Sequence, residues 1–271
     1  CSRDWSSDVC SSDLYQQQAG TVGGMLAAGM AGPARVAVGG VRDHVLGLAM
    51  FNGLGQHLRF GGQVMKNVAG YDVSRLMAGS MGTLGLVTEV SLKVLPFPVA
   101  EATLMLAMPQ EAALAQLQRW AAQPLPLNAS CWVHDDTAAT PQGYLFVRLR
   151  GAQAAVQSAQ PKMLADVQAL GFAGQAMDTR EAAADWRACA DQTLPFFLTP
   201  PGPEHALWRL SVPTTTPALD LPGSPLIEWH GGLRWVWAPT HQAHALRELA
   251  QGVGGHATLW RVSQAHGASD F

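Results

Sequence analysis

The chain has 271 residues, of which 48% are hydrophobic and 14% are charged, and its formal net charge is −3. Such a nearly neutral chain lacks the basic surface that nucleic-acid binding needs, so no nucleic-acid partner is expected. The apolar content is sufficient for a buried core in one or two domains.

The first fourteen residues differ in composition from the rest of the chain. DWSSDVCSSDL (4–14) contains four Ser and three Asp, and its Asp and Cys residues match no calcium-loop or zinc-site spacing, so no metal site is predicted. The string resembles the translation of a sequencing-library adapter. We therefore expect residues 1–14 to be an assembly artefact outside the fold. Without them the net charge is about −1. Two cysteines remain, Cys131 and Cys189, which are too few for a disulfide framework and suit a reducing compartment.

Residues 21–34 form an apolar stretch rich in small residues. The stretch is shorter than the ~20 residues that a membrane-spanning helix needs and contains Pro33, so we predict no transmembrane helix. Its glycines indicate backbone with unusual dihedral angles or close approach to another group. These glycines, with the one just before the stretch, are Gly20, Gly23, Gly24, Gly29 and Gly32.

The chain from residue 15 to residue 98 is dense in glycine and is predicted to consist mainly of short apolar strands. Residues 45–60 predict a β-hairpin, because Asn52-Gly53 is a strong turn signal between apolar runs. Asp72 is expected to cap a short helix that ends at Gly79. Residues 83–94 alternate as a strand that Pro96 and Pro98 close, marking a domain boundary. One face of this strand would carry Leu86, Thr88, Val90, Leu92 and Val94.

Residues 99–271 show a different pattern. Helical spacing of apolar residues appears at 110–122, 153–170, 179–190 and 241–251. Apolar runs typical of strands appear at 130–135, 144–151, 206–212, 226–237 and 256–262. This mixture predicts an α+β domain whose antiparallel sheet is covered by helices on one face.

The segment Gly79–Gly85 links the predicted helix to the predicted strand with glycines and hydroxyl residues. The backbone N–H groups of such a loop can bind an anion, and its glycines allow a ligand to touch the main chain. Tight turns explain loops of this kind equally well. The segment is not a Walker A motif, because no Gly-Lys-Ser/Thr follows.

Several longer motifs occur together in one order: GGMLAAGMAGP (23–33), GGVRDHVLGLAMFNGLGQHLRFGG (39–62) and VMKNVAGYDVSRLMAGSMGTLGLVTEVSLKVLP (64–96). They resemble the PCMH-type FAD-binding domain of the vanillyl-alcohol-oxidase superfamily, and within it the FAD-binding subunits of bacterial glycolate oxidases. The resemblance implies the C-terminal part of an FAD-binding domain at 15–98 and an α+β cap domain at 99–271. It also implies an upstream subdomain and a C-terminal return that this sequence lacks.

The resemblance assigns cofactor-binding roles to residues in four stretches. The first lies near the flavin ring and pyrophosphate, the second begins a strand, the third precedes the short helix and the fourth lies near the adenosine half. Arg42 and Asp43 are equally explained as a structural ion pair, and Thr88 as an ordinary strand residue. The residues are, in order, Gly23, Gly24, Ala27, Gly29; Arg42, Asp43; Lys66, Asn67, Gly70, Tyr71, Asp72; and Gly79, Ser80, Gly82, Thr83, Gly85, Thr88. Leu84, Leu86 and Val87 are expected in the core.

The resemblance implies a flavin-dependent oxidation of glycolate, a 2-hydroxy acid, to glyoxylate. Such chemistry needs a base for the hydroxyl proton, but the sequence identifies no catalytic residue. The nearest candidates are His230 beside Glu228, the pair His241 and His244, and His256. We expect a turn histidine at 230 and surface histidines at 241 and 244. The tryptophans that alternate through the predicted strands are expected in the core or at an interface: Trp208, Trp229, Trp235, Trp237 and Trp260.

The resemblance further implies a complex with a catalytic FAD subunit and an iron–sulfur subunit, at the cytoplasmic face of the inner membrane. This chain has no cysteine cluster for such a centre. Two alternatives stay open: a self-sufficient D-lactate or other 2-hydroxy acid dehydrogenase, and a non-catalytic scaffold with a flavin-binding fold.

Overall fold

The computed structural model describes residues 21–62, 70–136 and 142–263. Lys66 and Asn67 lie outside these ranges, as do residues 1–14. The chain divides into two compact units. The first runs to Phe97 and takes in Cys189–Asp191, and the second holds Pro98–Ala188 and the chain from Gln192 onward. Each unit is described by itself.

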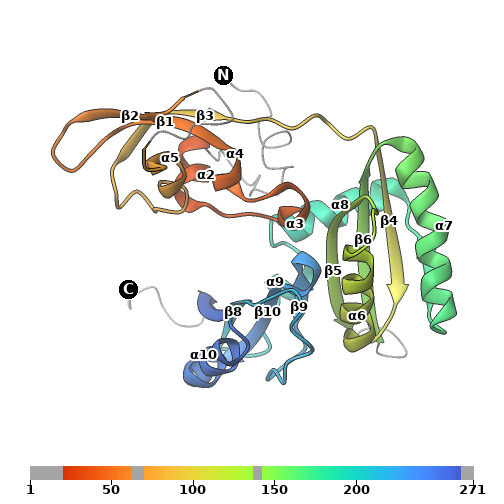
Figure 1. Cartoon of the computed structure of the whole chain (residues 1–271). Coiled ribbons are helices and arrows are strands. Elements are labelled where there is room, and N and C mark those ends of the chain that lie inside the picture. The colour runs from red at the N-terminus through yellow and green to blue at the C-terminus, as the bar shows by residue number, and fades with distance from the viewer. Residues whose placement is uncertain (1–20, 63–69, 137–141, 264–271) are drawn as a thin grey trace. The chain divides into compact units, whose positions relative to one another are not determined.

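The first unit contains a three-stranded antiparallel sheet in the order β2-β1-β3 (Figure 1). Its elements are α2 (Val22–Ala28), α3 (Arg35–Val38), α4 (Val41–His44), β1 (Val45–Phe51), β2 (His57–Gly61), α5 (Val73–Leu76) and β3 (Leu86–Leu92). Strands β1 and β2 form the predicted hairpin, with Phe51 paired to His57. The predicted cap is also confirmed, because the Asp72 carboxylate accepts a hydrogen bond from the backbone N–H of Arg75 at 3.1 Å.

The start of this unit is helical, where only short strands were expected. Thr21 caps α2, its hydroxyl accepting the N–H of Gly24 at 3.0 Å, and Leu26 of α2 is fully buried. Gly23 and Gly24 lie inside the helix, and neither they nor Gly32 have a positive φ, so of the two predicted reasons for these glycines unusual dihedral angles are excluded. An unusual backbone is confirmed at Gly29, which ends α2 in the left-handed region (φ 60°).

Strand β3 changes its face at a β-bulge. Ala49 pairs with Glu89 and Met50 pairs with Val87, which leaves Thr88 as the extra residue. Val87, Val90 and Leu92 therefore pack against the core of the first unit, and Leu86 points outward, 67% exposed. The predicted single face from Leu86 to Val94 is therefore wrong. Only Val90 and Leu92 of its members pack against the core, and Val94, beyond the end of β3, is 54% exposed. Leu84, 47% exposed, is likewise not a core residue.

The second unit is built on an eight-stranded antiparallel sheet in the order β11-β8-β10-β9-β5-β6-β4-β7. Its strands are β4 (Ala100–Ala107), β5 (Leu127–Asp135), β6 (Gln142–Gly151), β7 (Ala173–Ala176), β8 (His205–Ser211), β9 (Leu226–Glu228), β10 (Leu233–Pro239) and β11 (His256–Val262). Its helices are α6 (Gln110–Ala121), α7 (Gln153–Ala169), α8 (Thr179–Ala190), α9 (Pro195–Leu198), η1 (Trp229–Gly231), η2 (Thr240–Gln242) and α10 (Ala243–Gly252).

Two apolar cores stabilise this sheet. Leu117 and Trp120 of α6 and Met163 of α7 pack with Leu104 and Val147 of the strands, all 2% exposed or less. A separate cluster places α10 against β8 and β10. The predicted α+β class with an antiparallel sheet covered by helices is confirmed, whereas β4, β7 and α9 were not predicted.

Candidate cofactor-binding site

The predicted cofactor-binding segments 23–29 and 79–85 meet in the structure, although about fifty residues separate them in sequence. The backbone N–H of Gly79 donates to Leu26 O and that of Met81 donates to Ala27 O, both at 2.9 Å. The two carbonyl groups lie at the C-terminal end of α2, where the last carbonyls of a helix have no donor within the helix itself. The two bonds therefore satisfy them. A Cβ atom on Gly29 would lie 2.7 Å from the N and Cα of Gly79, so the close approach requires glycine.

The loop after α5 is internally bonded. Ser80 O accepts both the N–H of Thr83 at 3.0 Å and its hydroxyl at 2.6 Å, and the N–H of Ser80 donates to Met77 O at 3.2 Å. The backbone N–H groups of Ser80 and Thr83, which were candidates for anion binding, thus already donate hydrogen bonds within the loop. The loop instead offers exposed main chain around Gly82, beside the side chain of Met81, which is 68% exposed.

Three glycines at this junction leave the backbone open. Among the described residues, a Cβ atom built on Gly23, Gly79 or Gly82 would meet no other atom within 4 Å. All three glycines are exposed, as are the apolar side chains of Met81 and Leu84. A flat, largely apolar ring system such as a flavin fits a surface of this kind, because it can approach the main chain closely. We call these three glycines the glycine ridge.

Gly85 has a structural role at the beginning of β3. Its φ is 151°, and an added Cβ would lie 2.3 Å from Met50 Cε and 2.5 Å from Phe51 O. Thr88, at the bulge, donates its hydroxyl to Ala49 O at 3.2 Å. Both residues lie close to β1, Gly85 where the loop enters the sheet and Thr88 at the bulge within β3.

Arg42 and Asp43 lie in α4, not at the beginning of a strand as the resemblance implied; β1 begins at Val45. Asp43 accepts the N–H of Gly40 at 2.8 Å, which caps α4. Within the described ranges no ion pair joins Arg42 to Asp43, so the explanation as a structural ion pair is wrong. Both side chains are exposed.

The stretch before α5 is also on the surface. Asp72 pairs with Arg75 at 3.4 Å, Tyr71 is 96% exposed, and Gly70 is exposed with a left-handed backbone (φ 79°). Lys66 and Asn67, from the same predicted stretch, are outside the described residues.

The candidate histidines of the second unit make other contacts. His230 is buried in η1 between β9 and β10, and its Nδ1 lies 2.8 Å from the Ser130 hydroxyl. Burial lowers its pKa to about 4, so the ring is neutral at physiological pH. The Glu228 carboxylate instead accepts the indole N–H of Trp235 at 2.8 Å.

His230 is thus a turn histidine, as predicted. His241, His244 and His256 are exposed, which confirms the prediction for the first two. Of the five tryptophans predicted for the core or an interface, Trp208, Trp229, Trp235 and Trp237 are buried and Trp260 is half-buried.

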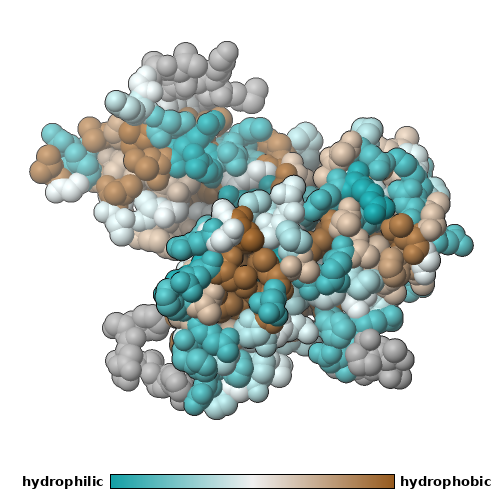
Figure 2. Space-filling view, turned by 60° about the horizontal axis from the view of Figure 1, so that its bottom comes forward, coloured by the Kyte–Doolittle hydropathy of each residue, from teal (hydrophilic) through white to brown (hydrophobic). Residues whose placement is uncertain are grey.

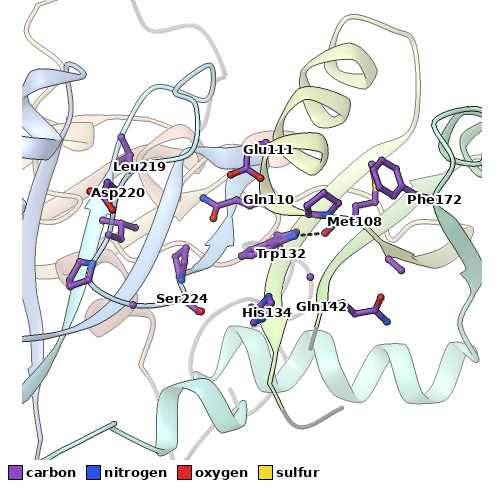
Figure 3. Close-up of a pocket in the computed structure, with 17 residues that line it drawn as sticks. Met108, Gln110, Glu111, Trp132, His134, Gln142, Phe172, Leu219, Asp220 and Ser224 are labelled. Atoms are coloured by element: carbon purple, nitrogen blue, oxygen red, sulfur yellow. Dashed lines mark hydrogen bonds between the residues drawn. The ribbon is translucent and has the colours of Figure 1, made fainter. Parts of the chain in front are cut away.

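A pocket in the second unit was missed by sequence reasoning (Figure 3). Its volume is about 800 Å³, and it lies between the start of α6, the end of β5, the start of β6 and residues 219–225. Trp132, whose indole donates to Met108 O at 3.0 Å, forms one wall, and the His134–Asp136 pair (3.1 Å) lies beside it. No local sequence motif predicts the pocket, because the residues that line it are distant from one another in the sequence. Its carboxylates, Glu111 and Asp220, make it a poor site for an anionic substrate.

In the described parts of the chain, no helix has the length and hydropathy to cross a membrane. No protein-family model matches the chain. Glycolate oxidase subunit GlcE of Escherichia coli (strain K12) is 43% identical over 249 residues, which cover 92% of this chain and 63% of that protein. Glycolate oxidase subunit GlcD of Bacillus subtilis is 40% identical over 93 residues (34% of this chain, 20% of that protein).

D-lactate dehydrogenase of Anaerostipes hadrus is 38% identical over 86 residues, which cover 32% of this chain and 18% of that protein. A solved structure of alkyldihydroxyacetonephosphate synthase superposes with a TM-score of 0.60 at 13% identity, covering 87% of this chain and 53% of that one, and shows a shared fold. The chain thus spans less than two thirds of the length of these relatives. The resemblance predicted from the motifs is confirmed: along 92% of its length the chain is similar to glycolate oxidase subunit GlcE.

Proposed function

We propose that this chain is part of the FAD-binding subunit of a glycolate oxidase complex. The observation that carries the proposal is the glycine ridge, where two motifs distant in sequence join through the backbone bonds of Gly79 and Met81. The ridge gives a flavin access to bare main chain. In this proposal residues 15–98 belong to the flavin-binding domain and residues 99–271 form the cap domain.

The individual roles follow from the geometry of the first unit. Gly23, Gly79 and Gly82 provide the surface that FAD covers, and Met81 and Leu84 flank it. Gly29 and Gly85 hold the segments in place, because any side chain at either position would collide with the neighbouring backbone. Bound FAD would supply the acceptor for the hydride that leaves C2 of glycolate as glyoxylate forms.

The base for the hydroxyl proton is assigned to a partner subunit. The buried His230 is held by Ser130, and His241, His244 and His256 are exposed on the second unit. We propose a catalytic FAD subunit and an iron–sulfur subunit as the partners, with the complex attached to the inner membrane through them. In the E. coli and B. subtilis relatives, GlcE and GlcD are both named as glycolate oxidase subunits.

The decisive experiment is an anaerobic titration of the full-length protein with glycolate, followed in the visible spectrum, first alone and then with the partner subunits. Flavin that stays oxidised alone and bleaches only in the complex supports the proposal. Bleaching by D-lactate in the isolated protein would favour the self-sufficient dehydrogenase. A complex that turns over glycolate while this subunit holds no flavin would favour the scaffold.

A further inference from the structure

The pocket beside Trp132 belongs wholly to the second unit and has the size of a small-molecule site. Its volume of about 800 Å³ lies within the range of ligand pockets, which is roughly 300–1,000 Å³. Apolar side chains form part of its lining, at Met108, Phe172, Leu219 and Leu221. No residue of the glycine ridge lines it, so the proposed binding of flavin does not account for it.

The wall formed by Trp132 is held in place from two sides. The indole N–H donates to Met108 O at 3.0 Å. Gly143 lies against the ring, because a Cβ atom added there would be 2.6 Å from Trp132 Cζ2 and 2.6 Å from Met108 O. The ring therefore keeps its position without a ligand, and it offers a fixed planar wall to one.

A second wall, residues 219–225, is also fixed. The loop that carries it is tied to β10 by Arg234, which donates to Thr216 O and Pro217 O at 2.6 and 2.7 Å. The two leucines of this wall pack against the apolar cluster of α10. Because both walls are preorganised, a ligand would lose little affinity to the ordering of the protein.

The charges of the pocket favour a cation. Glu111 at the start of α6 and Asp220 on the loop both line it and are exposed, and they come from opposite sides of the pocket (Figure 3). The lining residues, all of them described, include no lysine or arginine. His134 lies 3.1 Å from the Asp136 carboxylate, so it adds no net positive charge. The two carboxylates would attract an ammonium group and repel another carboxylate.

A side-chain amide in the pocket calls for an acceptor. Gln110 Nε2 is buried and has no hydrogen-bond partner among the described residues. Its side chain extends from the start of α6 toward the loop that carries Asp220 (Figure 3). A buried N–H without an acceptor costs free energy, so a ligand oxygen that accepts from it would gain affinity.

The lining thus combines charged, polar and apolar groups. The same mixture is seen on a wider scale in Figure 2, where hydrophobic residues of the second unit are bordered by hydrophilic ones. The ring of Trp132 can pack against a flat part of a ligand, and its face attracts positive charge. A ligand suited to the pocket therefore carries an ammonium group, an acceptor oxygen and a flat apolar part.

We propose that this pocket binds a small organic cation of that kind and excludes carboxylates. The ammonium group pairs with Glu111 and Asp220. The oxygen accepts the N–H of Gln110, and the flat part packs against Trp132. The proposal goes beyond the proposed function and does not depend on it, because the glycine ridge and the pocket belong to different units.

The test is a ligand-observed NMR titration of the full-length protein with para-aminomethylbenzamide, which has the three required groups. A dissociation constant below about 1 mM is expected for a probe of this size. Para-methylbenzamide, which lacks the ammonium group, should bind about tenfold more weakly, and para-methylbenzoate should bind more weakly still. Benzylamine, which lacks the carbonyl oxygen, should also bind more weakly than the first probe.

A double variant, Glu111→Gln with Asp220→Asn, removes the charges and keeps the shapes of the side chains. It should bind para-aminomethylbenzamide about tenfold more weakly and para-methylbenzamide as the wild type does. Glu204→Gln, at an exposed carboxylate that does not line the pocket, is the control and should bind both probes normally. Unchanged midpoints of urea unfolding verify the fold of each variant.

A tenfold loss confined to the cationic probe supports the proposal. It is overturned if para-aminomethylbenzamide does not bind below about 10 mM, or if the neutral or anionic probe binds as tightly. Wild-type affinity in the double variant would place the binding outside this pocket. An equal loss of the neutral probe would also contradict the proposal, since the substitutions would then act on the shape of the pocket and not on its charge.

Discussion

Single glycines in the first unit have distinct structural roles. Gly85, at the beginning of β3, is the position where a side chain is least tolerated. Gly85→Ala would place Cβ against Met50 Cε and Phe51 O in a backbone region that other residues avoid. We expect a loss of about 2–4 kcal/mol in the free energy of unfolding, measured by urea denaturation. Gly53→Ala, where the added Cβ meets nothing within 4 Å, should change it by less than about 0.5 kcal/mol. Equal effects of the two substitutions would refute the close-contact explanation.

His230 makes stability depend on pH. Its folded-state pKa, about 4, lies below the ordinary 6.5, so the unfolded chain binds the proton more readily. The stabilisation is therefore complete above pH 6.5 and is lost as pH falls toward 4, by on the order of 3 kcal/mol.

The matching variant is His230→Asn, since asparagine tolerates the left-handed backbone at this position (φ 53°) and cannot titrate. Denaturation curves at pH 7 and pH 4.5 should show a smaller loss of stability in the variant than in the wild type. Parallel pH profiles for the two proteins would rule out His230 as the titrating group.

At the scale of elements, a buried arginine ties a loop to the large sheet. Arg234 of β10 donates to Thr216 O (2.6 Å) and Pro217 O (2.7 Å), and burial lowers its pKa to about 10, so it stays charged at neutral pH. Arg234→Met would leave these carbonyl groups without their donor, at a cost of about 2–4 kcal/mol in thermal or urea unfolding. Arg187→Met, at an exposed position of α8, is the control and should be nearly neutral. If Arg234→Met left the free energy of unfolding unchanged, the hydrogen bonds from Arg234 to the loop would not contribute to stability.

Sequence motifs predicted correctly the elements that are stabilised by hydrogen bonds between neighbouring residues. Asn52-Gly53 predicted the hairpin and Asp72 predicted the cap of α5, because each side chain bonds to its own turn. The face of β3 was predicted wrongly, since the bulge at Thr88 arises from its pairing with β1. Helix α2 was missed because two glycines occupy its first turn, where Thr21 and the buried Leu26 outweigh their low propensity.

At the scale of the whole molecule, motif order predicted the family resemblance and the fold class, whereas the site required the structure. The sequence names Gly23 and Gly79 but cannot show that α2 and the loop after α5 share backbone hydrogen bonds. The pocket beside Trp132 was beyond local reasoning for the same reason, because it joins α6 to residues 219–225.

The central claim is that FAD lies on the glycine ridge, and the flavin content of purified full-length protein tests it most directly. Gly23→Leu is suited to the test, because position 23 is an exposed helical position where an added Cβ meets no described atom within 4 Å, so the fold should tolerate it. Gly252→Leu, at an equally open helical glycine of α10, is the matched control. Our account predicts that Gly23→Leu loses most of its flavin absorbance while Gly252→Leu keeps it. Full flavin content in a folded Gly23→Leu protein would contradict it.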